Sequence, residues 1–239
     1  MSHQRTERIS GATVLHPSQH LTDRTSGDPV TVDAPLFVFL WRRFSATAMA
    51  HGQGEHRRQL LDGLAGRVIE VGAGEGLNFA YYPPTVTEVI AVEPENRLRA
   101  SATTRARTAP VPIRVIPGVA DRLPADDAAF DAAVASLVLC SVPDQARALV
   151  ELGRVLRPGG ELRFYEHVAA DRQPLAGVQH LADPLWSRLG GGCHLTRRSE
   201  AAIREAGFTI ERIERFAFRP NLLGTLGSPH ILGTARRET

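Results

Sequence analysis

The stretch VIEVGAGEG, residues 68–76, indicates the fold of this chain more strongly than any other. Its apolar, β-branched run ends at Val71 and is followed by three alternate glycines, a pattern typical of a buried strand leading into a tight turn. Glycine tolerates positive φ and lets backbone N–H groups approach a ligand closely. The spacing is G-x-G-x-G, which differs from the G-x-G-x-x-G of dinucleotide-binding turns. We expect a helix after the turn, ending at Pro83.

Strand-like and helix-like segments alternate on both sides of this turn. Strands are expected at 67–71, 86–92, 113–116, 130–139, 161–168, 209–218 and 230–236. Helices are expected at 56–64, 95–108, 145–156 (capped by Asp144) and 196–206 (closed by Gly207). The alternation predicts an α/β fold with a single Rossmann-like, doubly wound sheet, mostly parallel with a late antiparallel strand, and helices on both faces.

The chain divides into three regions. Residues 1–32 are polar and without apolar periodicity, and we expect them to form a mobile tail or a lid. Residues 33–66 are expected to contain two helices, the first with Phe37, Trp41 and Phe44 on one side. Residues 67–239 are expected to form the main domain, with an insertion at about 169–206.

The composition excludes several kinds of chemistry. All 28 cationic side chains are arginine, so the chain offers no Schiff-base lysine, no pyridoxal-phosphate anchor and no P-loop lysine. A net charge of +2, with acids and bases interleaved, argues against a nucleic-acid partner. Two cysteines provide no disulfide framework and fit a reducing compartment. Residues 1–32 lack the apolar core of a signal peptide, and the longest apolar run near the N-terminus is too short to span a bilayer. We therefore expect a cytoplasmic protein without stable membrane insertion.

Acidic residues accompany three consecutive predicted strands. Glu70 lies within the first, Glu93 ends the second, 21 residues after Gly72 (93 − 72), and Asp121 follows the third. An acid at the end of the second strand of such a sheet binds ribose hydroxyls. Asp121 can accept a hydrogen bond from an exocyclic adenine amine, with Ala120 offering backbone contacts. The ordered acids predict a nucleoside cofactor.

From about residue 55 to its end, the chain resembles the class I S-adenosylmethionine-dependent methyltransferases. The resemblance is carried by VIEVGAGEG, AVEPE, GVADRLPADDAAFDAAVAS and RVLRPGGELRFYEH. It implies S-adenosyl-L-methionine as the cofactor. It also implies cofactor-binding roles for Glu70, Gly72, Ala73, Gly74 and Gly76 (methionine), Glu93 and Pro94 (ribose), Ala120 and Asp121 (adenine), and Ser136 and Leu137.

A narrower resemblance covers roughly residues 66–236. The segments LVLCSVPDQ, RVLRPGGELRFYEHVAA, DPLW, GGCHLTR and PHILGTA resemble the alkyl-thiol S-methyltransferases and their soluble bacterial relatives. The animal members carry an apolar anchor where this chain has a polar tail, so membrane association is not implied. The resemblance implies methylation of a small-molecule acceptor, with a thiol as the best candidate. The alternatives are an O- or N-methyltransferase of a natural product, a nicotinamide-dependent oxidoreductase and a non-catalytic cofactor-binding module.

Acceptor-side residues are expected at the ends of the fourth and fifth strands and in the insertion at about 169–206. His167 follows Glu166 at the end of the fifth strand, and both are candidate catalytic residues, His167 as a general base or an acceptor-orienting group. The alternative for His167 is a buried histidine bonded to a backbone carbonyl. Without lysine, proton removal depends on other groups, and a thiol needs the least help. The expected acceptor pocket contains Trp41, Tyr81, Tyr82, Cys140, Cys193 and His194. We predict no metal site, because the spacing of His180, Asp183, Cys193 and His194 matches no established one.

Overall fold

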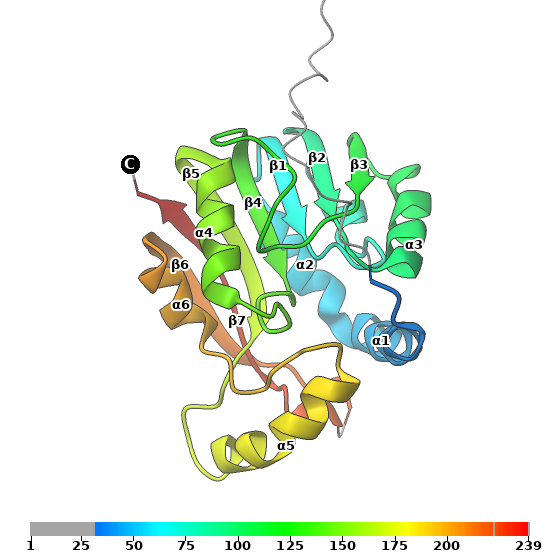
Figure 1. Ribbon diagram of the computed structural model, residues 1–239, viewed down its shortest axis with the longest axis vertical. Helices are drawn as coiled ribbons and strands as arrows, with labels where there is room; N and C mark the ends of the chain where they lie inside the picture. Colours follow the sequence, from blue (N-terminus) through cyan, green and yellow to red (C-terminus); the bar gives the residue numbers. More distant parts are fainter. Residues whose placement is uncertain (1–31, 222, 239) are drawn as a thin grey trace, which may run out of the picture.

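Seven strands form one sheet, in the order β3-β2-β1-β4-β5-β7-β6 (Figure 1). The computed structural model describes residues 32–221 and 223–238, so the predicted tail falls outside the described residues except for Val32. The strands are β1 (Gly66–Val71), β2 (Val86–Val92), β3 (Ile113–Ile116), β4 (Phe130–Ser136), β5 (Leu156–His167), β6 (Phe208–Ala217) and β7 (Pro229–Arg237). Neighbouring strands are parallel except at β7, which runs antiparallel to both β5 and β6. The predicted fold class is therefore confirmed.

Helices cover both faces of the sheet. These are α2 (Gly54–Leu61), α3 (Asn96–Ala106), α4 (Gln145–Val155) and α6 (Ser199–Glu205), whereas α1 (Pro35–Ala48) and α5 (Leu175–Leu189) lie beyond the carboxyl ends of the parallel strands (Figure 1). Short turns are η2 (Met49–Gln53), η3 (Phe79–Tyr81) and η4 (Leu223–Thr225). On one face, Leu61 of α2 and Ala102 of α3 pack on the strands, and on the other face Leu152 of α4 and Ile203 of α6 do so. Successive strand residues point to opposite faces, so both sets of side chains in the central strands are buried.

The segment after the glycine turn differs from the prediction. We expected a helix there, but the described chain forms turns and only the 3-10 element η3 before Pro83. Gly76 has a φ of 81°, which is incompatible with a continuing α-helix, and only six residues separate it from Pro83. Residues 72–85 therefore connect β1 and β2 without an α-helix.

Acidic side chains cap the first turns of α4 and α3 and so fix the loops that lead from β4 and β2 into these helices. The predicted cap Asp144 accepts a hydrogen bond from the backbone N–H of Arg147 at 2.9 Å, at the start of α4. Glu95, which we did not predict as a cap, accepts one from the N–H of Leu98 at 2.7 Å, at the start of α3. Both side chains satisfy an N–H group that has no partner within its helix.

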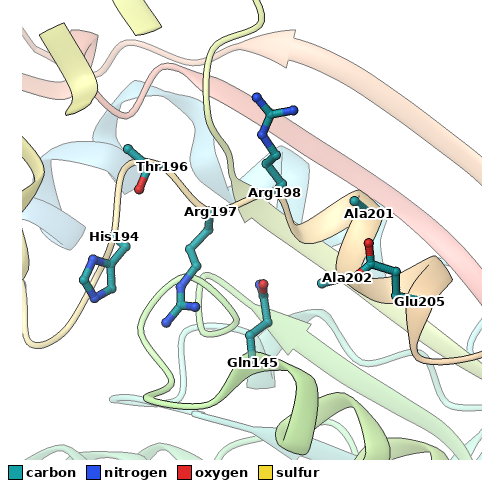
Figure 2. A pocket seen from close by; sticks show the side chains of 8 residues that line it. All are labelled: Gln145, His194, Thr196, Arg197, Arg198, Ala201, Ala202 and Glu205. Carbon is teal, nitrogen blue, oxygen red and sulfur yellow. The ribbon is translucent and has the colours of Figure 1, made fainter. Parts of the chain in front are cut away.

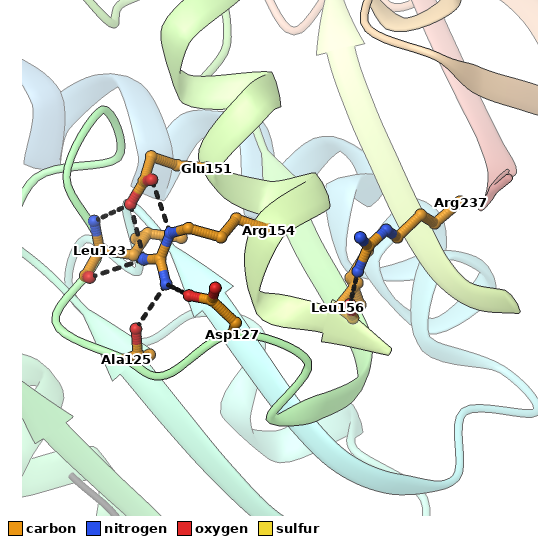
Figure 3. Close-up of polar contacts among 7 residues, drawn as sticks. All are labelled: Leu123, Ala125, Asp127, Glu151, Arg154, Leu156 and Arg237. Carbon is orange, nitrogen blue, oxygen red and sulfur yellow. Dashed lines mark hydrogen bonds and ion pairs between the residues drawn. The ribbon is translucent and has the colours of Figure 1, made fainter. Parts of the chain in front are cut away.

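The loop between β3 and β4 is held by an ion-pair network on α4 (Figure 3). Arg154 donates to the carbonyl oxygens of Ala125 at 2.8 Å and Leu123 at 3.2 Å. It also forms ion pairs with Asp127 and Glu151, both at 2.7 Å. Glu151 in turn accepts a hydrogen bond from the N–H of Leu123 at 2.8 Å. One arginine of α4 therefore fixes the loop that begins at the carboxyl end of β3.

Glycine substitutions test how closely the antiparallel strands pack. A Cβ atom added to Gly233 in β7 would lie 2.2 Å from the carbonyl oxygen of Arg212 and 2.6 Å from the ring of Phe164. We expect Gly233→Ala to lower the free energy of unfolding by about 1–3 kcal/mol. The matched control is Gly153→Ala in α4, where the nearest atom, on Phe208, is 3.8 Å away. That variant should gain about 0.5–1 kcal/mol from helix propensity. Urea unfolding followed by circular dichroism checks both, and equal midpoints for the two variants would contradict the close packing.

Candidate active site

The glycine turn has two closely packed glycines and one with an open side. Gly72, Gly74 and Gly76 all have positive φ, at 62°, 58° and 81°. A Cβ at Gly72 would lie 2.3 Å from Val138, and one at Gly76 would lie 2.7 Å from the ring of Phe79. At Gly74 the nearest atom would be Nε1 of Trp41, at 3.8 Å. The backbone around Gly74 is therefore the part of the turn that a ligand can approach.

Glu70 lies beneath this turn in a buried hydrogen-bond network. Its carboxylate accepts hydrogen bonds from Nδ2 of Asn78 at 2.8 Å and from the hydroxyl of Tyr82 at 2.7 Å. Arg57, also buried, donates to Oδ1 of Asn78 at 2.7 Å and to the hydroxyl of Ser136 at 3.2 Å. Burial raises the pKa of Glu70 to about 7, although the two hydrogen bonds and Arg57 act in the opposite direction. The network links β1, α2, the turn and the end of β4.

Glu93 holds the opposite side of the turn. Its carboxylate accepts hydrogen bonds from the backbone N–H of Gly74 at 2.8 Å and of Glu95 at 2.9 Å. The side chain is buried, and this burial raises its pKa. Each carboxylate oxygen retains capacity for a further donor. Pro94 continues the same segment, and its carbonyl accepts a hydrogen bond from the N–H of Val32.

Asp121 and Ala120 lie at the same edge of the sheet, in the turn after β3. A bridge between Val119 and Arg122 closes this turn, and the carbonyl oxygen of Asp121 accepts a hydrogen bond from Arg147 of α4 at 3.1 Å. Strand β3 pairs with β2. The turn that carries Asp121 therefore follows the strand adjacent to β2, and Glu93 directly follows β2. The three acids therefore belong to the adjacent strands β1, β2 and β3, in the order expected.

The fourth strand ends three residues earlier than the sequence predicts. It was expected to reach residue 139, but β4 ends at Ser136 because Leu137 has a φ of 57°. The N–H of Leu137 donates to the carbonyl oxygen of Tyr165 at 2.7 Å. The chain therefore turns away from the sheet directly after Ser136.

Glu166 holds the loop that follows this turn. Its buried carboxylate accepts hydrogen bonds from the backbone N–H groups of Val138 and Leu139, both at 3.0 Å, and of Cys140 at 3.3 Å. Burial raises the pKa of Glu166 to about 7, against the effect of these N–H donors. The carboxylate is thus occupied by backbone groups, which suits a positioning residue.

His167 is in contact with a cysteine that is remote in sequence. Its Nε2 lies 2.8 Å from Sγ of Cys193, and Sγ of Cys140 lies within 4.8 Å of both atoms. Hydrogen bonding with Cys140 and the positive charge of His167 lower the pKa of the Cys193 thiol. The sequence predicts each of the three as a site residue but does not predict that they meet. We name these three residues the Cys–His cluster.

The other predicted pocket residues have different surroundings. Tyr82 is buried against Glu70, beneath the turn. Tyr81 is half-buried, with the guanidinium of Arg58 5.4 Å from its ring centroid. Nδ1 of His194 pairs with Asp183 at 2.8 Å. Glu75, within the glycine-rich stretch, accepts hydrogen bonds from Ser45 at 3.0 Å and Arg105 at 3.2 Å.

A surface hollow of about 480 Å³ lies between the start of α4 and the segment that leads from His194 into α6 (Figure 2). Its lining residues are Gln145, His194, Thr196, Arg197, Arg198, Ala201, Ala202 and Glu205. Arg197 extends from this lining to donate to the carbonyl oxygen of Val142 at 2.8 Å, which ties the loop to the segment after β4. The hollow includes none of the acids or glycines of the turn, so we do not place the cofactor there.

Comparisons with known proteins identify the family. The family model for the methyltransferase domain matches residues 69–164. Over 182 residues the chain is 37% identical to the human thiol S-methyltransferase TMT1B, covering 73% of each protein. The chain is a class I S-adenosylmethionine-dependent methyltransferase. The implied methyl donor, S-adenosyl-L-methionine, is thereby confirmed, and the oxidoreductase and non-catalytic alternatives are set aside.

Other similarities of this methyltransferase are more distant. It is 34% identical over 116 residues to the phosphatidylethanolamine N-methyltransferase of Cereibacter sphaeroides, covering 48% of this chain and 57% of that protein. A crystal structure from Thermotoga maritima, described as a possible histamine N-methyltransferase, has a TM-score of 0.64 and 22% identity, covering 84% of this chain and 97% of that one. At that identity the similarity concerns the fold. Within the described part of the methyltransferase, every helix is too short or too polar to cross a bilayer.

The residues around the turn fit the methyl donor. Nε1 of Trp41 is buried, has no hydrogen-bond partner among the described residues, and lies on the open side of Gly74. Nε of Arg57 in the Glu70 network is likewise without a partner there. Buried polar groups are nearly always hydrogen bonded, so these donors favour a polar ligand at the turn.

The raised pKa of Glu70 gives a measurable pH dependence. Its pKa is about 7 in the folded protein, against an ordinary value of 4.5. The stability that this group contributes is therefore fully present below about pH 4.5 and is lost as the pH rises through about 7, a change of roughly 3 kcal/mol. Glu70→Gln stays neutral, so its free energy of unfolding should fall less than that of the parent between about pH 5 and 8. Urea titrations across this range measure the difference. Glu211→Gln, on the exposed edge strand, should follow the parent curve, and a Glu70→Gln curve parallel to the parent would contradict the assignment.

Proposed function

We propose that this methyltransferase moves the methyl group of S-adenosylmethionine to the sulfur of a small thiol. The observation that carries the proposal is the contact between His167 and Cys193, in a sulfur-containing cluster at the carboxyl end of β5. The similarity to thiol S-methyltransferases of human, rat and mouse supports the same acceptor class.

On the cofactor side, we assign each acid to one part of the donor. Glu70 and the glycine turn would hold the methionine portion, Glu93 and Pro94 the ribose, and Ala120 with Asp121 the adenine. Trp41 would donate its free indole N–H at the open side of Gly74. Ser136 and Leu137 would line the end of β4, where the backbone turns away from the sheet.

The chemistry requires little of the protein beyond positioning. The sulfonium of the donor makes its methyl carbon electrophilic, so the rate depends mainly on holding the acceptor sulfur in line with it. A thiol has an ordinary pKa near 8.5 and needs only modest assistance to lose its proton. In a chain without lysine, His167 is the base best placed at the strand ends to provide that assistance.

On the acceptor side, we assign different roles to the two candidate catalytic residues. Glu166 would act as a positioning residue, because its carboxylate is occupied by three backbone N–H groups. His167 would stabilise the acceptor as a thiolate. Cys140, Cys193, His194 and Tyr81 would surround the acceptor.

The ribose assignment is tested by removing the Glu93 carboxylate. We expect Glu93→Ala to lose one or two charge-assisted hydrogen bonds to the cofactor and so to lower its affinity by about 2–4 kcal/mol. Isothermal titration calorimetry with S-adenosylmethionine measures the change. Glu211→Ala, which removes a carboxylate from an edge-strand ion pair, should leave affinity unchanged. Because Glu93 also holds the N–H groups of Gly74 and Glu95, Glu93→Gln provides a less disruptive second variant with an intermediate expected loss. Parent-like affinity in both variants would exclude Glu93 from the ribose site.

The acceptor class is tested with matched compounds. An alkyl thiol, the alcohol and the amine of the same carbon skeleton are compared by the rate of S-adenosylhomocysteine formation. We expect the thiol to react at least about tenfold faster, because it ionises most readily near neutral pH. Turnover confined to the alcohol or the amine would refute thiol methylation and leave the enzyme an O- or N-methyltransferase.

A further inference from the structure

The Cys–His cluster brings together three side chains that bind soft metal ions. Cys140 lies in the loop after β4, His167 at the end of β5, and Cys193 in the loop after α5. Their ligand atoms, two Sγ and one Nε2, all lie within 4.8 Å of one another. Within the described part of the chain, no other group of three His, Cys, Asp or Glu side chains converges in this way.

The spacing of these atoms suits a tetrahedral metal ion. Zinc bonds of about 2.3 Å to sulfur and about 2.0 Å to nitrogen place nitrogen and sulfur about 3.5 Å apart, and two sulfurs about 3.8 Å apart. In the cluster, Nε2 of His167 and Sγ of Cys193 are 2.8 Å apart, and no pair exceeds 4.8 Å. Shifts of about 1 Å or less would bring the three donors to these separations.

The groups around the cluster support thiolate ligands. Nε1 of Trp186 donates a hydrogen bond to Sγ of Cys193 at 3.4 Å, and the hydroxyl of Ser141 lies 3.4 Å from Sγ of Cys140. Hydrogen bonds to ligand atoms orient the ligands of metal sites. Nδ1 of His167 is buried without a partner among the described residues, so it favours a hydrogen bond with a ligand or solvent molecule at this site.

The two loops that carry the cysteines are joined through their backbones. The N–H of His194, next to Cys193, donates to the carbonyl oxygen of Cys140 at 2.9 Å. Glu166 accepts a hydrogen bond from the N–H of Cys140 at 3.3 Å. Asp183 of α5 accepts one from the N–H of Leu195 at 2.6 Å. The two loops are therefore held by hydrogen bonds of their backbone groups, to each other and to the carboxylates of Glu166 and Asp183, that do not require the metal.

We propose that Cys140, His167 and Cys193 bind a Zn²⁺ ion whose fourth coordination position is open to the sulfur of the acceptor. The metal site is inferred from the geometry of the three side chains. Binding of the acceptor sulfur at the open coordination position rests on the proposed thiol methylation. Three protein ligands with one open position are typical of zinc sites that act on a substrate. With zinc bound, Nε2 of His167 would be a metal ligand, so the metal would replace His167 as the group that assists deprotonation in a chain without lysine.

The proposed methyl transfer needs no reactant other than the acceptor thiol and S-adenosylmethionine. The S–H bond of the acceptor breaks as its sulfur binds the metal, and the proton passes to solvent. The sulfur keeps the electron pair and forms the new bond to the methyl carbon. The bond between that carbon and the donor sulfonium breaks, its electron pair stays on the donor sulfur, and S-adenosylhomocysteine and the methyl thioether leave.

Metal content tests the site independently of methyl transfer. The full chain, purified under reducing conditions without chelator, is titrated with Zn²⁺ and, separately, with Co²⁺, whose bonds to thiolates produce charge-transfer absorption. We expect about one zinc ion per chain and a sulfur-to-cobalt band. Cys193→Ser, Cys140→Ser and His167→Gln should each weaken metal binding at least about 100-fold. His180→Gln, an exposed histidine on α5, is the matched control and should bind like the parent.

Cofactor titration of each variant separates loss of metal from loss of the fold, since a variant that still binds S-adenosylmethionine is folded. Failure of the reduced parent to bind zinc, or unchanged metal affinity in all three variants, would overturn the site. A disulfide between Cys140 and Cys193 that forms in preference to metal binding would do the same. Zinc binding without thiol turnover would support the metal site and refute the proposed acceptor. Thiol turnover at an unchanged rate after zinc removal would overturn the role of the metal in activation while leaving thiol methylation intact.

Discussion

The buried carboxylate of Glu70 is the interaction on which the cofactor edge depends. A carboxylate out of contact with water is costly, and here Asn78 and Tyr82 donate to it while the guanidinium of Arg57 lies one hydrogen bond further away. Loss of one member would leave the others buried without partners, a larger cost than a single hydrogen bond. Because these residues come from β1, the turn after it and α2, the network fixes the glycine turn relative to the sheet.

Sheet topology then determines which residues can share a site. Parallel strands end at the same edge of a sheet, so Glu70 in β1 and the residues Glu93 and Asp121, which follow β2 and β3, are brought to one edge on three adjacent strands. On the other side of β1, strands β4 and β5 deliver Cys140 and His167 to the same edge. The three acids proposed for the cofactor therefore lie on one side of this edge and the Cys–His cluster on the other, which suits the proposed transfer of a group between two bound molecules.

The sequence predicts the positions of β1, β2 and β4 well because their mainly apolar residues are buried on both faces, but β5 begins at Leu156, earlier than the predicted start at 161. It fails after Gly76, where helical composition is overridden by positive φ and a nearby proline. The sequence also does not reveal that three backbone N–H groups face the carboxylate of Glu166, which stays a candidate site residue. The Cys–His cluster is the clearest omission. Its members are separated by more than twenty residues and meet only because the loop after α5 folds back onto the loop after β4.

The antiparallel direction of β7 has a practical consequence. His230 pairs with His167 at the carboxyl end of β5 and Arg236 pairs with Glu161 further toward its amino end, so the described chain ends at the edge opposite the turn (Figure 1). At the other end of the described residues, the N–H of Val32 donates to the carbonyl oxygen of Pro94, next to Glu93. A dye or surface tether attached after residue 238 would thus leave the edge with the glycine turn and the Cys–His cluster accessible. The same attachment just before Val32 would lie close to Glu93 and Pro94 and would hinder access to the proposed cofactor site.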